Sequence, residues 1–550
     1  MASPRYRYQP VLPNQIRVLH LLPGIGREPL AGQLEPLTLP EPDAAEPLPF
    51  EALSYVWGGE TKSHALDVAG QSIPVTVSLQ TALVRLRHAD RRRVIWADAI
   101  CINQDDVSEK EAQVSLMGRI FSSATQVIAD LGDASNTSDA ALDLIDRHWR
   151  TVLCSGALTV LYGSRTPVET AAIMNLPPEA VDMAWTDHEL PGQESHEWES
   201  ICEIIQRPWF SRIWIVQEFV LAREVTFHCG TRVADWRHLL ALFFDFNSPS
   251  AFDALVTRWQ ITASHTAFIQ RHEMVSRIFH NRCIRLLQAK PAGRAFLSTL
   301  PQFSSVWTRS SWVDLLYSYR YFNCTIERDR YYALVSMASD RDVALRPELR
   351  PDYVTEDNDL RLAMGKLILQ LPGGAEAFMH SGLQTQTNPQ VQSWMQTFGR
   401  MGNATTFSHS DFDQASKAAG NDSSFSLSTL PGNPGTIALR GYRIGNIVKK
   451  AGQALLAKED EAQSADEFRK ARLSHYLGSA LDLFSEELLD QAPYVSPSKL
   501  DWWSLEAMAK AFALNPEPSV PTAIAVGFAV DTKLLTLGLL SIVHRGAAIV

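Results

Sequence analysis

Near the start of the chain, short apolar runs typical of strands alternate with segments in which apolar residues have helical spacing. Residues 50–59 read FEALSYVWGG and residues 92–102 read RRVIWADAICI, and both runs have the length and composition of buried strands. Between them, apolar residues recur every three or four positions, as on one face of a helix, at Leu79, Ala82, Leu83 and Leu86. Ser78 stands before this stripe and is predicted to cap the helix.

A second helix and a third strand follow. Ser108 and Glu111 have the three-residue spacing of a capping box, which predicts a helix start. Helical spacing then continues to Ala124, and residues 126–132, QVIADLG, form another short apolar run. Strands and helices that alternate with short connections are typical of a parallel sheet covered by helices. We therefore expect residues 48–245 to form one α/β domain with at least three parallel strands.

The rest of the chain divides by composition. We expect a proline-rich lead-in that packs on the domain, a mainly helical region, a flexible linker rich in Ser, Thr, Asn and Gly, and a mixed α/β region, at residues 1–47, 246–400, 401–436 and 437–550 respectively. The C-terminal apolar run 522–544 is interrupted by Asp531 and Lys533, which favours buried strands or a buried helix over a membrane span.

Composition narrows the class of protein. The chain is 45% hydrophobic and 20% charged, with a net charge of −11, so a nucleic-acid partner is not expected. Its 6 cysteines are scattered singly, as is typical of reduced thiols in the cytoplasm. The N-terminal residues lack the apolar core of a secretory signal. We expect a cytoplasmic protein that does not enter a membrane.

Four separated blocks share a pattern with a known family. They are FEALSYVWGG, IWADAICINQDD, the helix and strand of QVSLMGRIFSSATQVIADLG, and RPWFSRIWIVQE. In this order they resemble the heterokaryon incompatibility (HET) domain of filamentous fungi, over about residues 48–230. Two later segments, ERDRYYALVSMASD and LRPDYVTEDNDLRLAMGKLIL, extend the resemblance to about residue 370. The family usually has isoleucine where this chain has Ala97.

The resemblance implies a function. HET proteins act in non-self recognition and trigger growth arrest or programmed cell death when incompatible fungal cells fuse. Their domain is similar to the TIR fold, with Rossmann-like layering of helices on a parallel sheet. Two mechanisms follow from the resemblance, and the absence of a phosphate-binding fingerprint favours the first, a signalling module that acts through protein partners or self-association with no cofactor. The alternative is an NAD-cleaving TIR-like enzyme, with NAD as substrate, Glu218 or Asp98 as the acting carboxylate and Trp57 stacked on a ring of the substrate.

Candidate site residues gather where strands are predicted to end, because ligands of open α/β sheets bind at the carboxyl ends of their strands. One strand ends in Tyr55, Trp57, Gly58 and Gly59, and the next is followed by Asp98, Asn103 and Gln104. The simpler alternatives are that the aromatic residues belong to the core, that the glycines form a turn, and that Asn103 and Gln104 hold the loop. Asp98 needs a partner if buried, and Arg207 or Arg212 is a candidate counter-ion.

A third group comes from a helix after Ser211. Trp214, Gln217 and Glu218 share a face by their spacing, and a carboxylate beside an indole suits acid–base chemistry. The alternative is a helix anchor in which Glu218 pairs with an arginine. Cys101 has no activating base in its motif, so an inert thiol is expected. We predict that one pocket collects Tyr55, Trp57, Asp98, Asn103, Trp214, Gln217 and Glu218.

Motifs for other chemistries are missing. The segment GIGREPLAG lacks the third glycine of a dinucleotide fingerprint. The chain also has no GxxxxGK[ST], HExxH or GxSxG sequence and no paired Cys and His spacing for a metal. A conventional nucleotide triphosphatase, a zinc protease and an esterase are therefore disfavoured.

Overall fold

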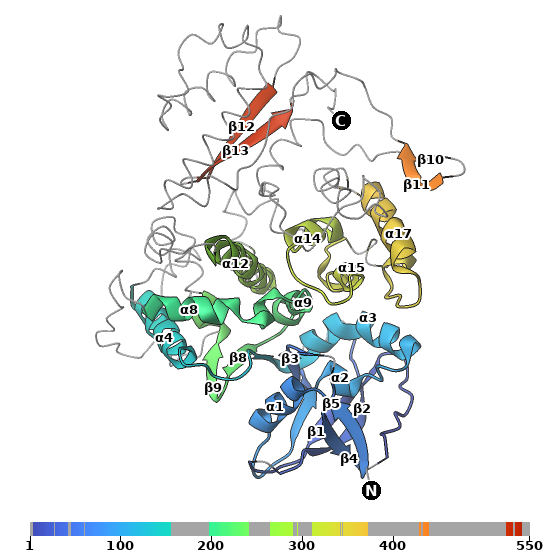
Figure 1. Cartoon of the computed structure of the whole chain (residues 1–550), viewed down its shortest axis with the longest axis vertical. Helices are drawn as coiled ribbons and strands as arrows, with labels where there is room; N and C mark the ends of the chain where they lie inside the picture. The colour runs from blue at the N-terminus through green and yellow to red at the C-terminus, as the bar shows by residue number, and fades with distance from the viewer. Residues whose placement is uncertain are drawn as a thin grey trace, which may run out of the picture. The chain divides into compact units, whose positions relative to one another are not determined.

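The chain forms two compact units. The structure, a computed structural model, describes residues 4–26, 28–41, 46–59, 61–155, 197–240, 264–289, 294, 311–340, 343, 345–371, 374, 428–430, 433–438, 524–531 and 534–541. One unit comprises residues 1–247 and 266–364, and the other comprises residues 248–265 and 365–550. The first unit contains the sheet and the candidate site (Figure 1).

A mixed sheet of 9 strands is the centre of the first unit. In spatial order the strands are β5 (Gln71–Val75), β4 (His64–Val68), β2 (Ala31–Thr38), β1 (Gln15–Leu21), β6 (Arg93–Trp96), β3 (Leu48–Tyr55), β7 (Ala124–Asp130), β8 (Val225–Cys229) and β9 (Arg232–Asp235). The adjacent strands β6, β3, β7 and β8 are parallel, and antiparallel strands flank them on both sides. The predicted α/β class and the parallel strands are confirmed, although the whole sheet is mixed.

The sheet also uses residues from the expected lead-in. In β1, Ile16, Leu19 and Leu21 are fully buried, and β1 pairs antiparallel with both β2 and β6. Strand β1 continues the apolar core on the outer side of β6. The expected boundary at residue 47 therefore does not separate two units in the structure.

Helices connect and follow these strands. They are α1 (Val77–Leu86), α2 (Asp98–Cys101), α3 (Val107–Ser123), α4 (Ser138–Ser155), α8 (Glu197–Gln206), α9 (Trp214–Val220), α12 (Ser264–Ala289), α14 (Trp312–Ser318), α15 (Asp329–Tyr332) and α17 (Asp357–Gln370), with short 3-10 helices η1 (Pro208–Ser211), η3 (Val335–Met337) and η4 (Pro347–Leu349). Those from α12 onward lie in the region 246–400. None of the helices in the described ranges is long and apolar enough to cross a membrane.

Two predicted helix starts were each wrong by two residues. Helix α1 is capped by Thr76, whose hydroxyl accepts from the amide of Leu79, and Ser78 donates instead to the carbonyl of Trp57 at 2.7 Å. Helix α3 is capped by Asp106, which accepts from the amide of Glu109 at 3.1 Å. The predicted Ser108–Glu111 box therefore lies inside the first turn. Ser78 acquires a different role, because it ties the loop after β3 to α1.

The second unit is described only in short pieces. Strand β10 (Ser428–Leu430) pairs antiparallel with β11 (Asn433–Ala438), and β12 (Ile524–Asp531) pairs antiparallel with β13 (Leu534–Ser541). The last pair forms from the C-terminal apolar run, for which strands were one of the two expected structures. Most of the expected linker 401–436 and of the region 437–550 lies outside the described residues.

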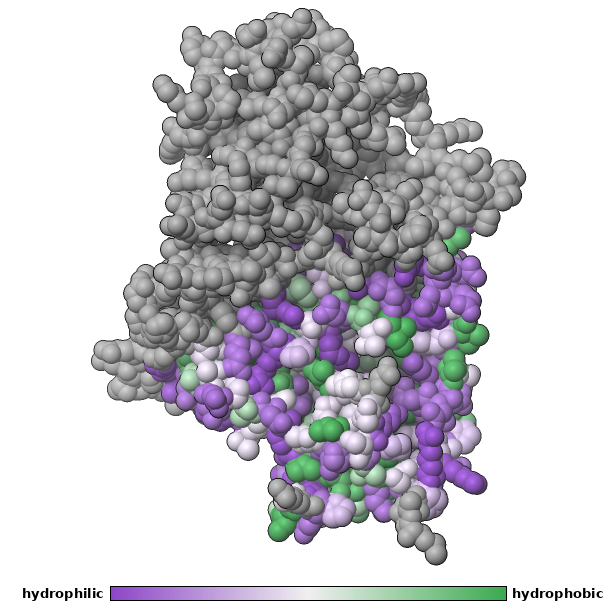
Figure 2. Space-filling view, in the orientation of Figure 1, coloured by the Kyte–Doolittle hydropathy of each residue, from purple (hydrophilic) through white to green (hydrophobic). Residues whose placement is uncertain are grey.

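An aromatic cluster joins the sheet to helices on one side. The ring centroids of Phe219 on α9 and Phe279 on α12 are 4.6 Å apart, and those of Trp209 and Phe227 on β8 are 5.3 Å apart. The visible face of the first unit is mostly hydrophilic, with apolar side chains scattered singly (Figure 2). The large aromatic residues of this cluster are therefore buried in the interior, as expected for a globular fold.

We expect Phe279→Ala to destabilise the first unit strongly. Phe279 is fully buried, so its truncation leaves a cavity and lowers the free energy of unfolding by about 3–5 kcal/mol. Urea denaturation followed by tryptophan fluorescence measures the change. Leu345→Ala is the control, because Leu345 is 77% exposed and its truncation changes the free energy by less than about 0.5 kcal/mol. Equal effects of the two changes would contradict this assignment of the core.

Candidate functional site

The carboxyl group of Glu218 is buried against strand β3. Its Oε2 shares a hydrogen bond with the hydroxyl of Ser54, and the indole of Trp209 donates to the same hydroxyl at 2.8 Å. Burial raises the pKa of Glu218 to about 7, although the charge of Arg212 and the Ser54 hydrogen bond lower it. Near neutral pH this carboxyl therefore exists in comparable amounts as the acid and the carboxylate.

Helix α9 is held from its C-terminal end. Arg282 on α12 is fully buried and donates to the carbonyls of Phe219 and Ala222 at 2.6 and 2.7 Å. A cation at the last carbonyls of a helix satisfies groups that have no partner within the helix. Since Ile215, Val216 and Phe219 are also buried, the helix has little freedom to turn Glu218 toward solvent.

Asp98 lies where β6 passes into the short helix α2. Its Oδ2 accepts a hydrogen bond of 2.9 Å from the indole of Trp57, and its Oδ1 accepts one of 2.7 Å from the amide of Ala99. Burial raises the pKa of Asp98, and Arg212 and the hydrogen bond from Trp57 oppose that shift. Asp98 and Trp57 are neither fully buried nor exposed. Because β3 and β6 are parallel neighbours, the residues after both strands meet at one edge.

Arg212 connects the two carboxyl groups. It donates from Nη1 to the carbonyl of Tyr55, and its positive charge lowers the pKa of both Asp98 and Glu218. Arg207, the other candidate counter-ion, lies elsewhere, because it donates to the carbonyls of Leu131 and Asp133 at 2.8 Å.

Tyr55 belongs to the same cluster. Its side chain is buried, and burial followed by the negative charge of Asp98 raises the pKa of Tyr55 well above its ordinary value. The phenol therefore stays neutral. Tyr55, Trp57, Asp98 and Glu218 are the predicted site residues that the structure brings together around Arg212.

Trp214 and Gln217 lie on α9 but face a different segment. The indole of Trp214 donates to Asp329 Oδ2 at 3.0 Å, and Gln217 Oε1 accepts from the hydroxyl of Ser336 at 2.6 Å. Successive residues of a helix point about 100° apart, so Gln217 and its neighbour Glu218 cannot share one target. The predicted convergence is wrong for Trp214 and Gln217.

Asn103 and Gln104 lie in the loop after α2. The amide of Asn103 donates to Glu109 Oε1 at 2.8 Å, and the side chain of Gln104 donates to the carbonyl of Asp98 at 3.0 Å. Glu109 is fixed in turn by a 2.6 Å ion pair with Arg17 on β1. These bonds hold the loop in place, which was the simpler alternative.

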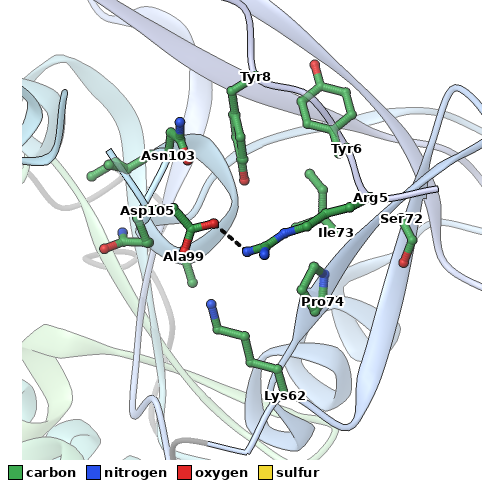
Figure 3. A pocket seen from close by; sticks show the side chains of 12 residues that line it. Arg5, Tyr6, Tyr8, Lys62, Ser72, Ile73, Pro74, Ala99, Asn103 and Asp105 are labelled. Atoms are coloured by element: carbon green, nitrogen blue, oxygen red, sulfur yellow. Dashed lines mark hydrogen bonds and ion pairs between the residues drawn. The ribbon is translucent and has the colours of Figure 1, made fainter. Parts of the chain in front are cut away.

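The same loop residues line a surface pocket (Figure 3). Arg5 and Lys62 both extend into it, and Arg5 pairs with Asp105. Neither Asp98 nor Glu218 lines this pocket. The prediction that Asn103 joins the Glu218 cluster is therefore wrong, and the pocket is a separate feature with a polar, charged lining.

The two glycines after Trp57 differ in their constraints. Gly58 has a φ of +74°, and a Cβ there would lie 3.2 Å from the hydroxyl of Ser78. Only glycine adopts this conformation without strain, so Gly58 serves the turn. Gly59 is exposed, and a Cβ there would meet nothing within 4 Å.

Two further chemistries lack support. Burial raises the pKa of the Cys101 thiol to about 12, so it is not a thiolate near neutral pH. Within the described ranges, no group of three or more His, Cys, Asp or Glu residues is arranged to hold a metal ion.

Some residues of the cluster escaped the sequence analysis. Ser54 could have been noticed, because a hydroxyl inside an apolar strand needs a partner. Trp209 lies in the block that includes Arg207 and Arg212, but nothing in its spacing indicates its contact with Ser54. Asp329, the partner of Trp214, gave no signal, because the two residues are distant in the chain.

Comparison with known proteins identifies the segment that contains this cluster. Residues 50–218 match the family described as Heterokaryon incompatibility protein (HET). The chain is 29% identical over 338 residues to Heterokaryon incompatibility protein 6, OR allele, of Neurospora crassa, and the alignment covers 56% of this chain and 45% of that relative. The chain thus matches less than half of that relative's length. No solved structure matched the chain.

We expect Glu218→Gln to change how stability depends on pH. The folded-state pKa of about 7 exceeds the ordinary value of 4.5, so the neutral carboxyl stabilises the fold below pH 4.5 and this contribution is lost as the pH rises through 7. The loss amounts to roughly 2–3 kcal/mol. The variant has no ionising group at this position and does not undergo this loss. Its free energy of unfolding therefore rises relative to that of the wild type between pH 4.5 and 8.

Urea titrations of both proteins at several pH values measure this difference. Glu348→Gln is the control, because it makes the same chemical change at an exposed residue. If the free energies of unfolding of both variants change with pH in parallel with that of the wild type, the prediction is contradicted. Glu218 is then already ionised in the folded protein at acid pH.

Proposed function

We propose that this chain, whose residues 50–218 form a heterokaryon incompatibility (HET) domain, acts in fungal non-self recognition and triggers growth arrest or programmed cell death. The observation that carries the proposal is that the family match, residues 50–218, includes both Ser54 and Glu218, the two partners of the buried hydrogen bond. The name of the Neurospora crassa relative supports the same biological role.

Signalling through protein contacts in the cytoplasm is the mechanism we favour. In this mechanism the domain binds a partner or a second copy of itself, and the Glu218 cluster maintains the geometry of the sheet edge that takes part. Trp57 and Asp98 are the groups of the cluster that a partner can reach, since both are partly exposed. Asn103 and Gln104 add a separate polar pocket on the loop after Asp98.

A specific observation favours a second candidate, cleavage of NAD by a TIR-like mechanism. Glu218 has a pKa of about 7, which suits a general acid or base at neutral pH, and it lies in one cluster with the Asp98–Trp57 pair. Glu218 or Asp98 would act on the substrate, Trp57 would stack on a ring, and the backbone at Gly58 and Gly59 would lie near the phosphates. In this candidate Trp214 and Gln217 support α9.

We expect Glu218→Gln to abolish cell death when the full chain is expressed in fungal hyphae. The replacement keeps the size of the side chain but removes its proton exchange and its charge, so a functional carboxyl is lost while the fold remains. Thermal melting near pH 7 confirms that the variant is folded. If Glu218 were only an anchor, the same change would lower stability by about 1–3 kcal/mol and function would fall with it. The exposed control Glu348→Gln retains full activity.

Loss of NAD from a solution of the purified protein decides between the two mechanisms. The enzyme candidate predicts NAD loss with the wild type and none with Glu218→Gln or Asp98→Asn. The signalling candidate predicts no NAD loss from any of the three proteins, together with death signalling by the wild type. An active Glu218→Gln variant would contradict the assigned role of Glu218.

A further inference from the structure

We propose that Asp329, which lies beyond the HET match, is a positioning residue for this site: it fixes the helix α9 that carries Glu218. The inference deepens the proposed function and rests on it. It means that residues 311–357 complete the site that the HET segment begins.

The first support is a backbone clamp on Arg212. The amide of Ile213 donates to the carbonyl of Asn323 at 2.8 Å, and the amide of Asn323 donates to the carbonyl of Ser211 at 2.6 Å. These bonds hold the chain on both sides of Arg212, which lies between η1 and α9 and whose amide donates to the carbonyl of Trp209. Arg330, itself buried, donates to the carbonyl of Phe322 at 2.9 Å and so fixes the turn that contains Asn323.

The second support is the set of hydrogen bonds around Asp329. Its Oδ2 accepts from the indole of Trp214 on α9 at 3.0 Å, and its Oδ1 accepts from the hydroxyl of Tyr353 at 2.7 Å. Tyr353 is held by α3, because its amide donates to Glu111 at 2.7 Å and Lys110 lies 4.1 Å from the centre of its ring. Asp329 therefore links α9 to α3 through two side chains with fixed positions.

The third support is charge. Burial raises the pKa of Asp329, and the hydrogen bonds from Trp214 and Tyr353 and the charges of Lys110 and Arg212 lower it. Arg212 thus acts on Asp329 as well as on Asp98 and Glu218. Arg212 is the smallest of these influences on Asp329, so the hydrogen bonds from Trp214 and Tyr353 are the main support for its positioning role.

Nearby residues provide matched comparisons. Asp340 also has its pKa raised by burial and accepts from the amide of Trp312 at 3.0 Å, but Arg212 is not among the groups that shift its pKa. Asp340→Asn therefore removes a carboxylate of the same segment without touching the site. Tyr353→Phe removes one hydrogen bond to Asp329 and leaves its charge in place.

The experiment compares Asp329→Asn, Asp340→Asn and Tyr353→Phe in the full chain, each with Glu218 and with Glu218→Gln. In each background, the free energy of unfolding of the protein with Glu218 is compared with that of the protein with Gln at this position. The way this difference changes with pH gives the pH range over which Glu218 ionises. We expect Asp329→Asn to move this range toward acid pH by about half a unit or more, because a less firmly held α9 lets water reach Glu218 and reduces the burial that raises its pKa. Neither control moves it. In hyphae, Asp329→Asn weakens death signalling at least tenfold and Asp340→Asn leaves it unchanged.

A purely structural Asp329 would leave the Glu218 range where it is, and that result overturns the proposal. If Asp329→Asn fails to fold, Trp214→Phe tests the same link, since it cuts Asp329 from α9 and retains the charge. Signalling by this variant at the wild-type level would also overturn the proposal. A wild type that causes no cell death contradicts the proposed function instead, and the pH measurement still tests the role of Asp329.

Discussion

The guanidinium of Arg212 is the group on which the rest of the site depends. It binds the carbonyl that ends β3, and its charge acts on Asp98 after β6 and on Glu218 in α9. Strand ends of a parallel sheet bring polar groups together by topology alone, but they do not make two acidic groups compatible in a buried place. One cation shared between them does so at lower cost than two separate ion pairs, each of which would need its own desolvation.

That cation depends on chain outside the segment that defines the family. Asn323 holds its backbone, Trp214 and Asp329 fix the helix beside it, and Arg282 holds the far end of the same helix. The described helices after residue 264 are therefore part of the domain's structure rather than an appendage. A match over residues 50–218 identifies the domain, but it does not mark the limits of what folds as one unit.

The sequence predicted those parts of the fold that depend on the spacing of neighbouring apolar residues. The apolar runs of β3 and β6 and the helical stripe of α1 predicted a parallel sheet with helices, and the acid after β6 indicated a partly buried carboxylate. Ser78 was misjudged because Thr76 caps the helix and a carbonyl near in space takes the Ser78 hydroxyl. Asn103 was misjudged because the buried Arg17–Glu109 pair, formed across distant residues, sets the path of its loop. Asp329 was out of reach for the same reason.

The placement of β1 carries a consequence for work with fragments of the chain. This strand covers the outer side of β6, and β9 covers the outer side of β8, so neither border of the parallel strands is open. A fragment trimmed to start at residue 48 would expose the amides and carbonyls of β6 as a template for strands of other molecules. Its aggregation would then reflect a missing neighbouring strand and not a property of the intact chain.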